Sequence, residues 1–125
     1  MRSCDFTFQQ IYFAAGESRI QKHQRWGLDQ NASGLLDKAC GGYARRLELA
    51  GHADATETDA ARLALERARV VERYLVSKGV ARDRLRVRGY GSRRPVRRGT
   101  APADLATNRR VEFVVLEPAK PPSAK

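Results

Sequence analysis

The sequence predicts an α+β fold, a two-layer sandwich in which a mixed four-stranded sheet carries two main helices on one face. Segments with strand-like alternation and segments with helical periodicity follow in the order strand, helix, strand, helix, strand, short helical turn, strand. The 125 residues, 42% of them hydrophobic, are enough for one compact core and too few for two. No apolar run approaches the roughly 18 residues that a bilayer-spanning helix needs.

The first half of the chain is predicted to form one strand and one helix. Phe6–Phe13 is rich in aromatic and β-branched residues, and its alternation breaks at Gln9-Gln10, where we expect an irregularity. Residues 22–40 place their apolar side chains on one helical stripe. Gly41-Gly42 is expected to end this helix, because glycine accepts the left-handed conformation that closes a helix.

The second half supplies the other strands and the longer helix. Strands are expected over residues 45–50, 85–88 and 110–116, with a short helical turn over residues 102–106. Thr56 and Asp59 fit the capping pattern in which a hydroxyl and a carboxylate satisfy the free amides of a helix start. The helix that follows them is expected to run to about Lys78.

Arg67 lies where this longer helix should have an apolar residue. At about 100° per residue it falls inside the apolar arc, one turn after Leu63 and one turn before Val71. A charge there costs free energy unless it is paired and hydrogen-bonded. Two alternatives stay open: the stem packs while the head reaches water, or the head faces a carboxylate, for which Asp54 is the nearest candidate.

The net charge of +10 favours an anionic partner such as nucleic acid, acidic lipid headgroups or a polymer bearing carboxylates. Part of the charge is concentrated in the segment Arg93–Arg98, which could equally be a solvated loop. No recognition helix, zinc finger or aromatic-basic motif accompanies it. We therefore do not expect nucleic acid as a partner, although a basic nucleic-acid-binding domain remains the competing class of function.

No pattern in the sequence predicts an enzyme. His52 has no nucleophile or orienting carboxylate at a motif spacing, and Gly89 and Gly91 do not complete a phosphate-binding loop. The cysteines and histidines form no zinc pattern, so no metal and no cofactor are expected. Cys4 and Cys40 could form one disulfide in an oxidising compartment and would be free thiols in the cytosol.

A series of short motifs carries a family resemblance. They are Gly51-His52-Ala53-Asp54, Leu63–Ala68, Val71, Tyr74-Leu75, Lys78-Gly79-Val80, Arg88–Gly91, Pro95-Val96 and Asn108–Phe113, with Tyr12-Phe13, Ser18 and Ile20 upstream. Over residues 9–116 the chain thereby resembles the OmpA-like, peptidoglycan-binding domain of outer-membrane proteins, peptidoglycan-associated lipoproteins and flagellar motor stators. Residues 1–8 would be a lead-in, and the Pro/Ala/Lys-rich residues 117–125 a disordered tail.

The resemblance implies non-covalent, non-enzymatic binding of peptidoglycan through the diaminopimelate residue of its stem peptide. The free end of that residue carries an ammonium and a carboxylate on one carbon. By resemblance, Asp54 binds the ammonium and Arg67 binds the carboxylate. Further candidates near the ligand are Ala53, Phe13, Asn108 and Arg109. Phe13 could instead belong to the core, and Arg109 to the edge of the sheet.

The chain also departs from the family pattern. Ala53 stands where Thr is usual, Ala60 and Ala64 stand where Asn and Ser are usual, and the loop before the longer helix is about two residues shorter. The lost polar contacts leave open an interaction module of this fold that no longer binds the wall. The implied location is the periplasmic side of the outer membrane. Because Met1–Asp5 does not read as a signal peptide, membrane attachment is expected only through a parent protein.

Overall fold

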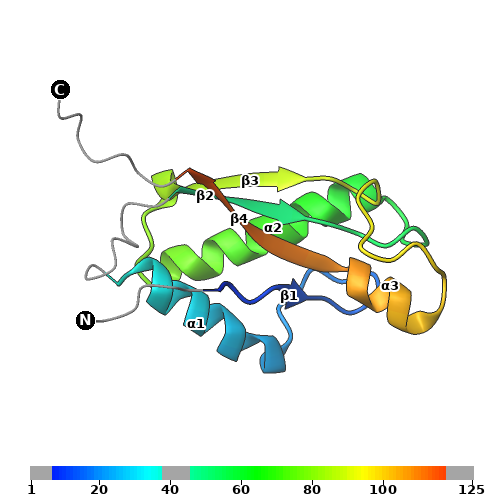
Figure 1. Ribbon diagram of the computed structural model, residues 1–125, viewed down its shortest axis with the longest axis horizontal. Coiled ribbons are helices and arrows are strands. Elements are labelled where there is room, and N and C mark those ends of the chain that lie inside the picture. Colours follow the sequence, from blue (N-terminus) through cyan, green and yellow to red (C-terminus); the bar gives the residue numbers. More distant parts are fainter. Residues whose placement is uncertain (1–6, 38–45, 118–125) are drawn as a thin grey trace.

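The computed structural model describes residues 7–37 and 46–117. In chain order the elements are β1 (Ile11–Tyr12), the 3₁₀ helix η1 (Lys22–Gln24), α1 (Arg25–Leu35), β2 (Arg46–Gly51), α2 (Ala60–Ser77), the 3₁₀ helix η4 (Arg82–Arg84), β3 (Leu85–Gly89), α3 (Pro102–Asn108) and β4 (Arg110–Glu117) (Figure 1). Within these residues, every helix is too short or too polar to cross a membrane.

The strands form one mixed sheet in the order β1-β4-β2-β3. β2 and β3 are parallel, whereas β4 is antiparallel to both of its neighbours, β2 and β1. The register sets Leu49 beside Val87 on one side and Phe113 on the other. These side chains share one face of the sheet, because side chains opposite each other in a ladder point the same way.

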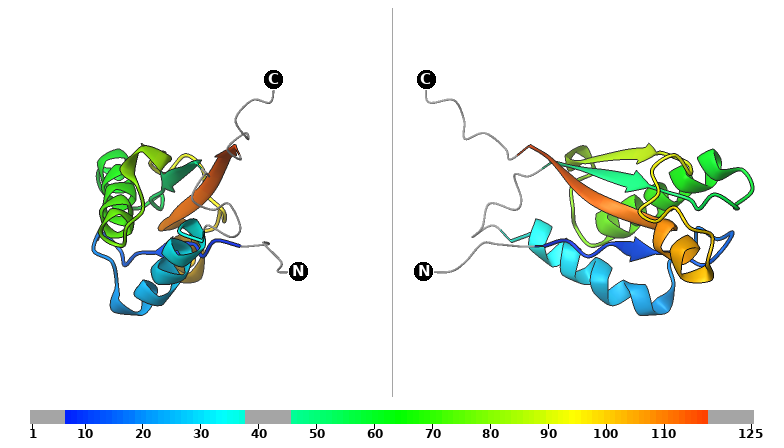
Figure 2. Two further views of the ribbon diagram at one scale, coloured as in Figure 1. Left: turned by 90° about the vertical axis from the view of Figure 1, so that its left-hand side faces the viewer. Right: turned by 45° about the vertical axis from the view of Figure 1, so that its right-hand side comes forward.

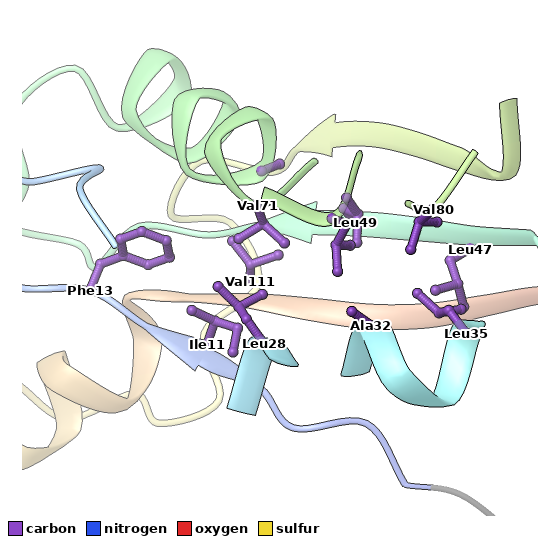
Figure 3. Packing of buried hydrophobic residues seen from close by; sticks show 12 residues of the cluster. Ile11, Phe13, Leu28, Ala32, Leu35, Leu47, Leu49, Val71, Val80 and Val111 are labelled. Carbon is purple, nitrogen blue, oxygen red and sulfur yellow. The ribbon is translucent and has the colours of Figure 1, made fainter. Parts of the chain in front are cut away.

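Both main helices cover this same face, as predicted. One core joins apolar side chains of α1, α2 and the inward face of the sheet (Figure 3). Its fully or almost fully buried members are Ile11, Phe13, Leu28, Ala32, Leu35, Leu47, Leu49, Ala68, Val71, Leu75, Val80 and Val111. The shorter helix α3 lies at the end of the sheet where β4 begins, beside β1 (Figure 2). This arrangement confirms the two-layer α+β sandwich.

Two glycines let α2 lie close to the ends of β2 and β3. A Cβ atom at Gly51 would collide with the carbonyl oxygen of Ala64, and one at Gly89 would lie 2.8 Å from the backbone nitrogen of Leu65. The loop that follows β2 therefore leaves the sheet directly against α2. This close approach positions Asp54, which lies on that loop, beside the side chains of the helix.

The first strand is shorter than predicted. Its ladder contains Ile11 and Tyr12, whereas the aromatic pattern predicted a strand over residues 6–13. The backbone of Gln9 instead pairs with the buried side chain of Asn31 in α1: Gln9 N donates to Asn31 Oδ1, and Asn31 Nδ2 donates to Gln9 O, both at 2.8 Å. The irregularity expected at Gln9 thus lies where hydrogen bonds to the Asn31 side chain replace hydrogen bonds to a neighbouring strand.

The first helix is also shorter than predicted. Residues 22–24 are 3₁₀ helix, and α1 ends at Leu35, so the helix expected over residues 22–40 was too long. Leu36 is the C-cap residue of α1, with φ −93° and ψ −2°. It lies two residues after Gly34, and a glycine weakens a helix by about 1 kcal/mol relative to alanine. The expected stop at Gly41-Gly42 lies outside the described residues, as do Cys4 and Cys40.

The predicted cap of the second helix was wrong in detail. α2 begins at Ala60 after Asp59, which has a left-handed φ of 55° and makes no side-chain cap. The Asp59 carboxylate pairs with Arg62 at 2.8 Å. The Thr56 hydroxyl and amide both donate to Asp54 Oδ1 instead. The polar residues before α2 therefore organise the preceding loop and do not cap the helix.

We predict that Asn31→Ala lowers the free energy of unfolding by about 2 kcal/mol, because it removes both hydrogen bonds to Gln9 at a buried position. Gln30→Ala is the matched control, since Gln30 is an exposed amide in the same helix. Urea unfolding followed by circular dichroism measures both variants. Equal midpoints for the two would contradict the role assigned to Asn31.

Candidate functional site

A buried ion pair between Arg67 and Glu57 lies at the centre of the candidate site. Arg67 is fully buried in α2, and the Glu57 side chain is 3% exposed. Two parallel hydrogen bonds join them, Nη1 to Oε1 at 2.7 Å and Nη2 to Oε2 at 2.5 Å. The head of Arg67 therefore faces a carboxylate and does not reach water. The carboxylate is that of Glu57, whereas Asp54 was the expected partner.

All five N–H donors of Arg67 are used. Besides the bonds to Glu57, Nε donates to the carbonyl oxygen of Glu17 at 2.8 Å, Nη1 to that of His52 at 3.1 Å, and Nη2 to that of Ala14 at 3.2 Å. The guanidinium carbon also lies 5.4 Å from the centre of the Phe13 ring, within cation–π range. This complete pairing explains how a guanidinium can lie inside an apolar arc.

The Glu57 carboxylate is equally well satisfied. The backbone N–H of Gly16 donates to Oε2 at 2.8 Å, and that of Asp54 donates to Oε1 at 2.9 Å. Burial acts to raise the pKa of Glu57, but the hydrogen bonds from Arg67, Gly16 and Asp54 outweigh it and hold the pKa below its ordinary value of 4.5. Glu57 is therefore a carboxylate at neutral pH.

Asp54 lies in the same cluster with other partners. It is 1% exposed; its Oδ1 accepts both bonds from Thr56, and its Oδ2 accepts Arg109 Nη1 at 3.1 Å. Burial acts to raise its pKa, and the bonds from Thr56 and Arg109 together hold the pKa below its ordinary value of 3.8. Asp54 and Glu57 are thus two neighbouring anions, each paired with its own guanidinium group.

An open hollow of about 440 Å³ lies beside Arg109, between the end of β1 and α3. It is lined by Tyr12, Phe13, Ala14, Ala15, Gln21, Ala106, Thr107 and Arg109. Arg109 is 16% exposed and is fixed by a bond from its Nε to the carbonyl oxygen of Phe13, 2.8 Å long. Its Nη2 hydrogen-bonds none of the described residues. Arg109 thus carries positive charge to the wall of the hollow.

The remaining candidates differ in their surroundings. Phe13 is a core residue, 2% exposed, that also lines the hollow. Ala53 is buried, and its amide donates to the carbonyl oxygen of Gly91. The amide group of Asn108 binds the backbone of Val96 and Arg97 through three hydrogen bonds of 2.7–3.1 Å. Asn108 therefore holds the arginine-rich loop, and its side chain does not line the hollow.

His52 belongs to a separate polar cluster next to β4. Its ring is 2% exposed and stacks on Tyr90, with ring centres 5.4 Å apart. Neither ring nitrogen has a hydrogen-bond partner among residues 7–37 and 46–117, and Glu112 lies 3.6 Å from Nε2. Burial, followed by the charges of Arg110 and Arg94, lowers the pKa of His52 to about 4 against the opposing effect of Glu112. His52 is therefore neutral at pH 7.

Glu57 is the residue of this site that the sequence reasoning missed. Asp54 and Glu57 have the three-residue spacing of a reciprocal cap, and Glu57 N also donates to Asp54 O at 3.2 Å. The same spacing relates Thr56 to Asp59, so spacing alone does not say which pair forms. Among the described residues, no group of three His, Cys, Asp or Glu side chains is placed to hold a metal ion.

We predict that Arg67→Met lowers the free energy of unfolding by about 3–5 kcal/mol. The change removes the charged partner of the buried Glu57 carboxylate and the N–H groups of Arg67 that donate to three carbonyl oxygens. Arg69→Met removes the same charge from an exposed position of α2 and should change stability by about 0.5 kcal/mol or less. Urea midpoints measure both. A loss for Arg67→Met no larger than that for Arg69→Met would contradict a structural role for the pair.

We predict that acidification from pH 6.5 to pH 5 destabilises the domain by about 1.5 kcal/mol through His52. In this range the unfolded chain, with an ordinary His pKa of 6.5, takes up a proton that folded His52, with a pKa of about 4, does not. Protons bound by the unfolded state favour unfolding. Asp54 and Glu57 act at lower pH, because their stabilisation is lost as the pH falls below their ordinary values.

His52→Phe should keep the stacking on Tyr90 and flatten this pH dependence. His23→Phe, at an exposed position, is the matched control. Urea midpoints at pH 6.5, 5.75 and 5 give the slopes. An unchanged slope in His52→Phe would refute the assignment.

Comparison with known proteins places this geometry in a family. The model of the OmpA family matches residues 12–109. The peptidoglycan-associated lipoprotein of Pseudomonas aeruginosa is 37% identical over 105 residues, which cover 82% of this chain and 60% of that protein. Outer membrane porin F of Pseudomonas fluorescens is 44% identical over 74 residues, 58% of this chain and 23% of the porin.

The fold has solved counterparts. The crystal structure of the peptidoglycan-associated lipoprotein from Burkholderia pseudomallei superposes with a TM-score of 0.77 at 28% identity, covering 85% of this chain and 88% of that one. The fold, the position of the motifs and the similarity in sequence agree with one another. The chain belongs to the OmpA family.

Proposed function

We propose that this domain binds peptidoglycan non-covalently through the diaminopimelate residue of the stem peptide, and that it anchors an envelope protein to the cell wall without catalysing a reaction. The observation that carries the proposal is the clustering of two ion pairs, Asp54 with Arg109 and Glu57 with Arg67, next to an open hollow that Arg109 lines. A ligand with an ammonium and a carboxylate on one carbon needs both signs of charge within a few ångströms.

Asp54 is suited to the ligand's ammonium. Its lowered pKa keeps it ionised at neutral pH, and Oδ2 accepts one hydrogen bond, from Arg109, so that a further lone pair can accept an ammonium N–H. Burial strengthens this attraction relative to an exposed carboxylate. Asp54 would therefore select ligands that carry a positive group next to their carboxylate.

Arg67 is suited to the ligand's carboxylate. Its guanidinium is oriented by three backbone carbonyl groups and already binds one carboxylate in the two-bond geometry. Arg109 supplies a second positive group at the wall of the hollow, with Phe13 beside it. Ala53 and Asn108 have no direct part in this proposal, because one is a buried methyl group and the other binds the loop at Val96.

Relatives support the class of ligand and the location. The Pseudomonas aeruginosa relative is named for its association with peptidoglycan, and the Pseudomonas fluorescens relative is an outer membrane porin. We accordingly propose the periplasmic side of the outer membrane as the location. The chain spans 60% of the length of the former. The net charge of +10 would attract the carboxylate-bearing wall at low salt.

Co-sedimentation with purified sacculi rich in diaminopimelate tests the proposal. The wild type should sediment, and Asp54→Asn and Arg67→Lys should weaken binding by about tenfold or more, because each alters one half of the zwitterion site. Asp83→Asn and Arg69→Lys make the same changes at exposed positions and should bind like the wild type. Circular dichroism confirms that every variant is folded.

Undiminished binding by both site variants would refute the site. A folded wild type that ignores sacculi but binds random-sequence DNA in a salt-sensitive manner would favour the nucleic-acid-binding class instead. Binding to neither would favour an interaction module that has lost wall binding.

A further inference from the structure

We propose that Glu57 fills a carboxylate-binding site from within the chain, and that an external carboxylate reaches Arg67 only when Glu57 leaves. The inference rests on the proposed function, because it concerns the regulation of the same site. It makes Glu57 an internal competitor of the ligand. The loop that carries Glu57 would then have two states, one in which Glu57 closes the site and one in which the site binds a ligand.

The surroundings of the Glu57 carboxylate are those of a built anion site. Four donors converge on its two oxygens: two guanidinium N–H groups of Arg67 and the backbone N–H groups of Gly16 and Asp54, at 2.5–2.9 Å. The donors come from three separate segments, the loop after β1, the loop after β2 and α2. None of these donors depends on the identity of the residue that supplies the carboxylate.

Occupancy by Glu57 leaves Arg67 without a donor for a ligand. Its five N–H groups are all bound within the chain, and the guanidinium is fully buried. A ligand carboxylate cannot add to this arrangement; it must take over the bonds that Glu57 makes. The exchange preserves the number of ion pairs, because a buried carboxylate is replaced by another and Glu57 is released to water.

The loop that carries Glu57 can release it without disturbing the core. Ala55, Thr56, Thr58 and Asp59 around it are all exposed, so Glu57 is the one inward-facing side chain of residues 55–59. The loop is joined to α2 through Asp59, whose left-handed φ of 55° is unusual for a residue with a side chain. Outward rotation of this loop moves no member of the hydrophobic core.

The turn at the start of this loop directs the internal occupant toward Arg67. By resemblance, the loop is about two residues shorter than the family pattern, and it turns back at once through the bond from Glu57 N to Asp54 O. The reciprocal bond from Asp54 N to Glu57 Oε1 aims the carboxylate at Arg67. A ligand that binds only the open state has its apparent dissociation constant raised by the inverse of the open fraction, so a closed state favoured tenfold weakens binding about tenfold.

The test compares wild type, Glu57→Ala, Glu57→Gln and the control Glu66→Ala, which removes a 41%-exposed glutamate of α2. Two probes are used: free diaminopimelate, with affinity measured by calorimetry, and acetate, with the thermal midpoint measured against chloride at equal ionic strength. Glu57→Ala should bind diaminopimelate at least about tenfold more tightly than the wild type. Acetate should raise the midpoint of Glu57→Ala and leave the wild type and Glu66→Ala unchanged.

Glu57→Gln keeps the test decisive if Glu57→Ala does not fold. It fills the same volume with a neutral amide that pairs less well with Arg67, and its affinity for diaminopimelate should rise by a smaller factor, about two- to tenfold. Where the wild type binds diaminopimelate measurably, an affinity equal to or below that of the wild type in a folded Glu57 variant overturns the proposal. In that case Glu57 is purely structural.

The outcomes separate this inference from the proposed function. If the wild type binds sacculi and the Glu57 variants bind diaminopimelate no more tightly, the function stands and the internal competitor is refuted. If no variant binds sacculi or diaminopimelate, yet acetate selectively stabilises Glu57→Ala, the carboxylate site occupied by Glu57 stands and the function is refuted.

Discussion

The buried pair of Arg67 and Glu57 is the constraint to which the loops at this end of the molecule are fitted. Charges removed from water are tolerated in a protein interior when their hydrogen bonds are complete. Arg67 meets this condition through the carbonyl groups of residues in two loops, and Glu57 meets it through two backbone amides. The paths of both loops therefore follow from the need to satisfy one guanidinium in α2.

Two other buried polar side chains also fix the path of the backbone through hydrogen bonds. Asn31 pairs with Gln9 where a longer β1 would have found a strand, and Asn108 fixes the loop at Val96 and Arg97. Each of these amides is buried and uses both its oxygen and its nitrogen. The apolar core sets the layers of the sandwich, whereas the buried amides and the ion pair set where the irregular segments lie.

Sequence patterns predicted those elements of the fold that depend on local periodicity. The alternation at Leu47 and Leu49 and the apolar arc of α2 identified β2, α2 and the fold class, and the same arc singled out Arg67 as anomalous. The extent of β1 and the end of α1 could not be predicted in this way. The extent of β1 depends on the bonds of Asn31 to Gln9, a contact distant in sequence that overrides local preference. The end of α1 depends on the local geometry after Gly34, which the apolar stripe does not encode.

Sequence patterns singled out three of the charged residues that lie together here and missed both Glu57 and the pairings. Asp54, Arg67 and Arg109 lie together, but Asp54 pairs with Arg109, and Arg67 pairs with Glu57. Which carboxylate faces which guanidinium depends on the turn between residues 54 and 59, and its left-handed residue Asp59 has no sequence signal of its own. A turn that carries its own acidic residue therefore sets which carboxylate faces Arg67.

The position of β3 in the sheet order has a consequence for association between copies of the chain. β3 is an edge strand of the described sheet, so one side of its backbone has no neighbouring strand within the part of the chain that the structure describes. Its exposed side chains are Arg86 and Arg88. A second copy that added β3 to β3 would set arginine against arginine at the short spacing of a β-ladder, which like charges oppose. The arginines of this strand thus protect the open edge of the sheet against extension into a larger assembly.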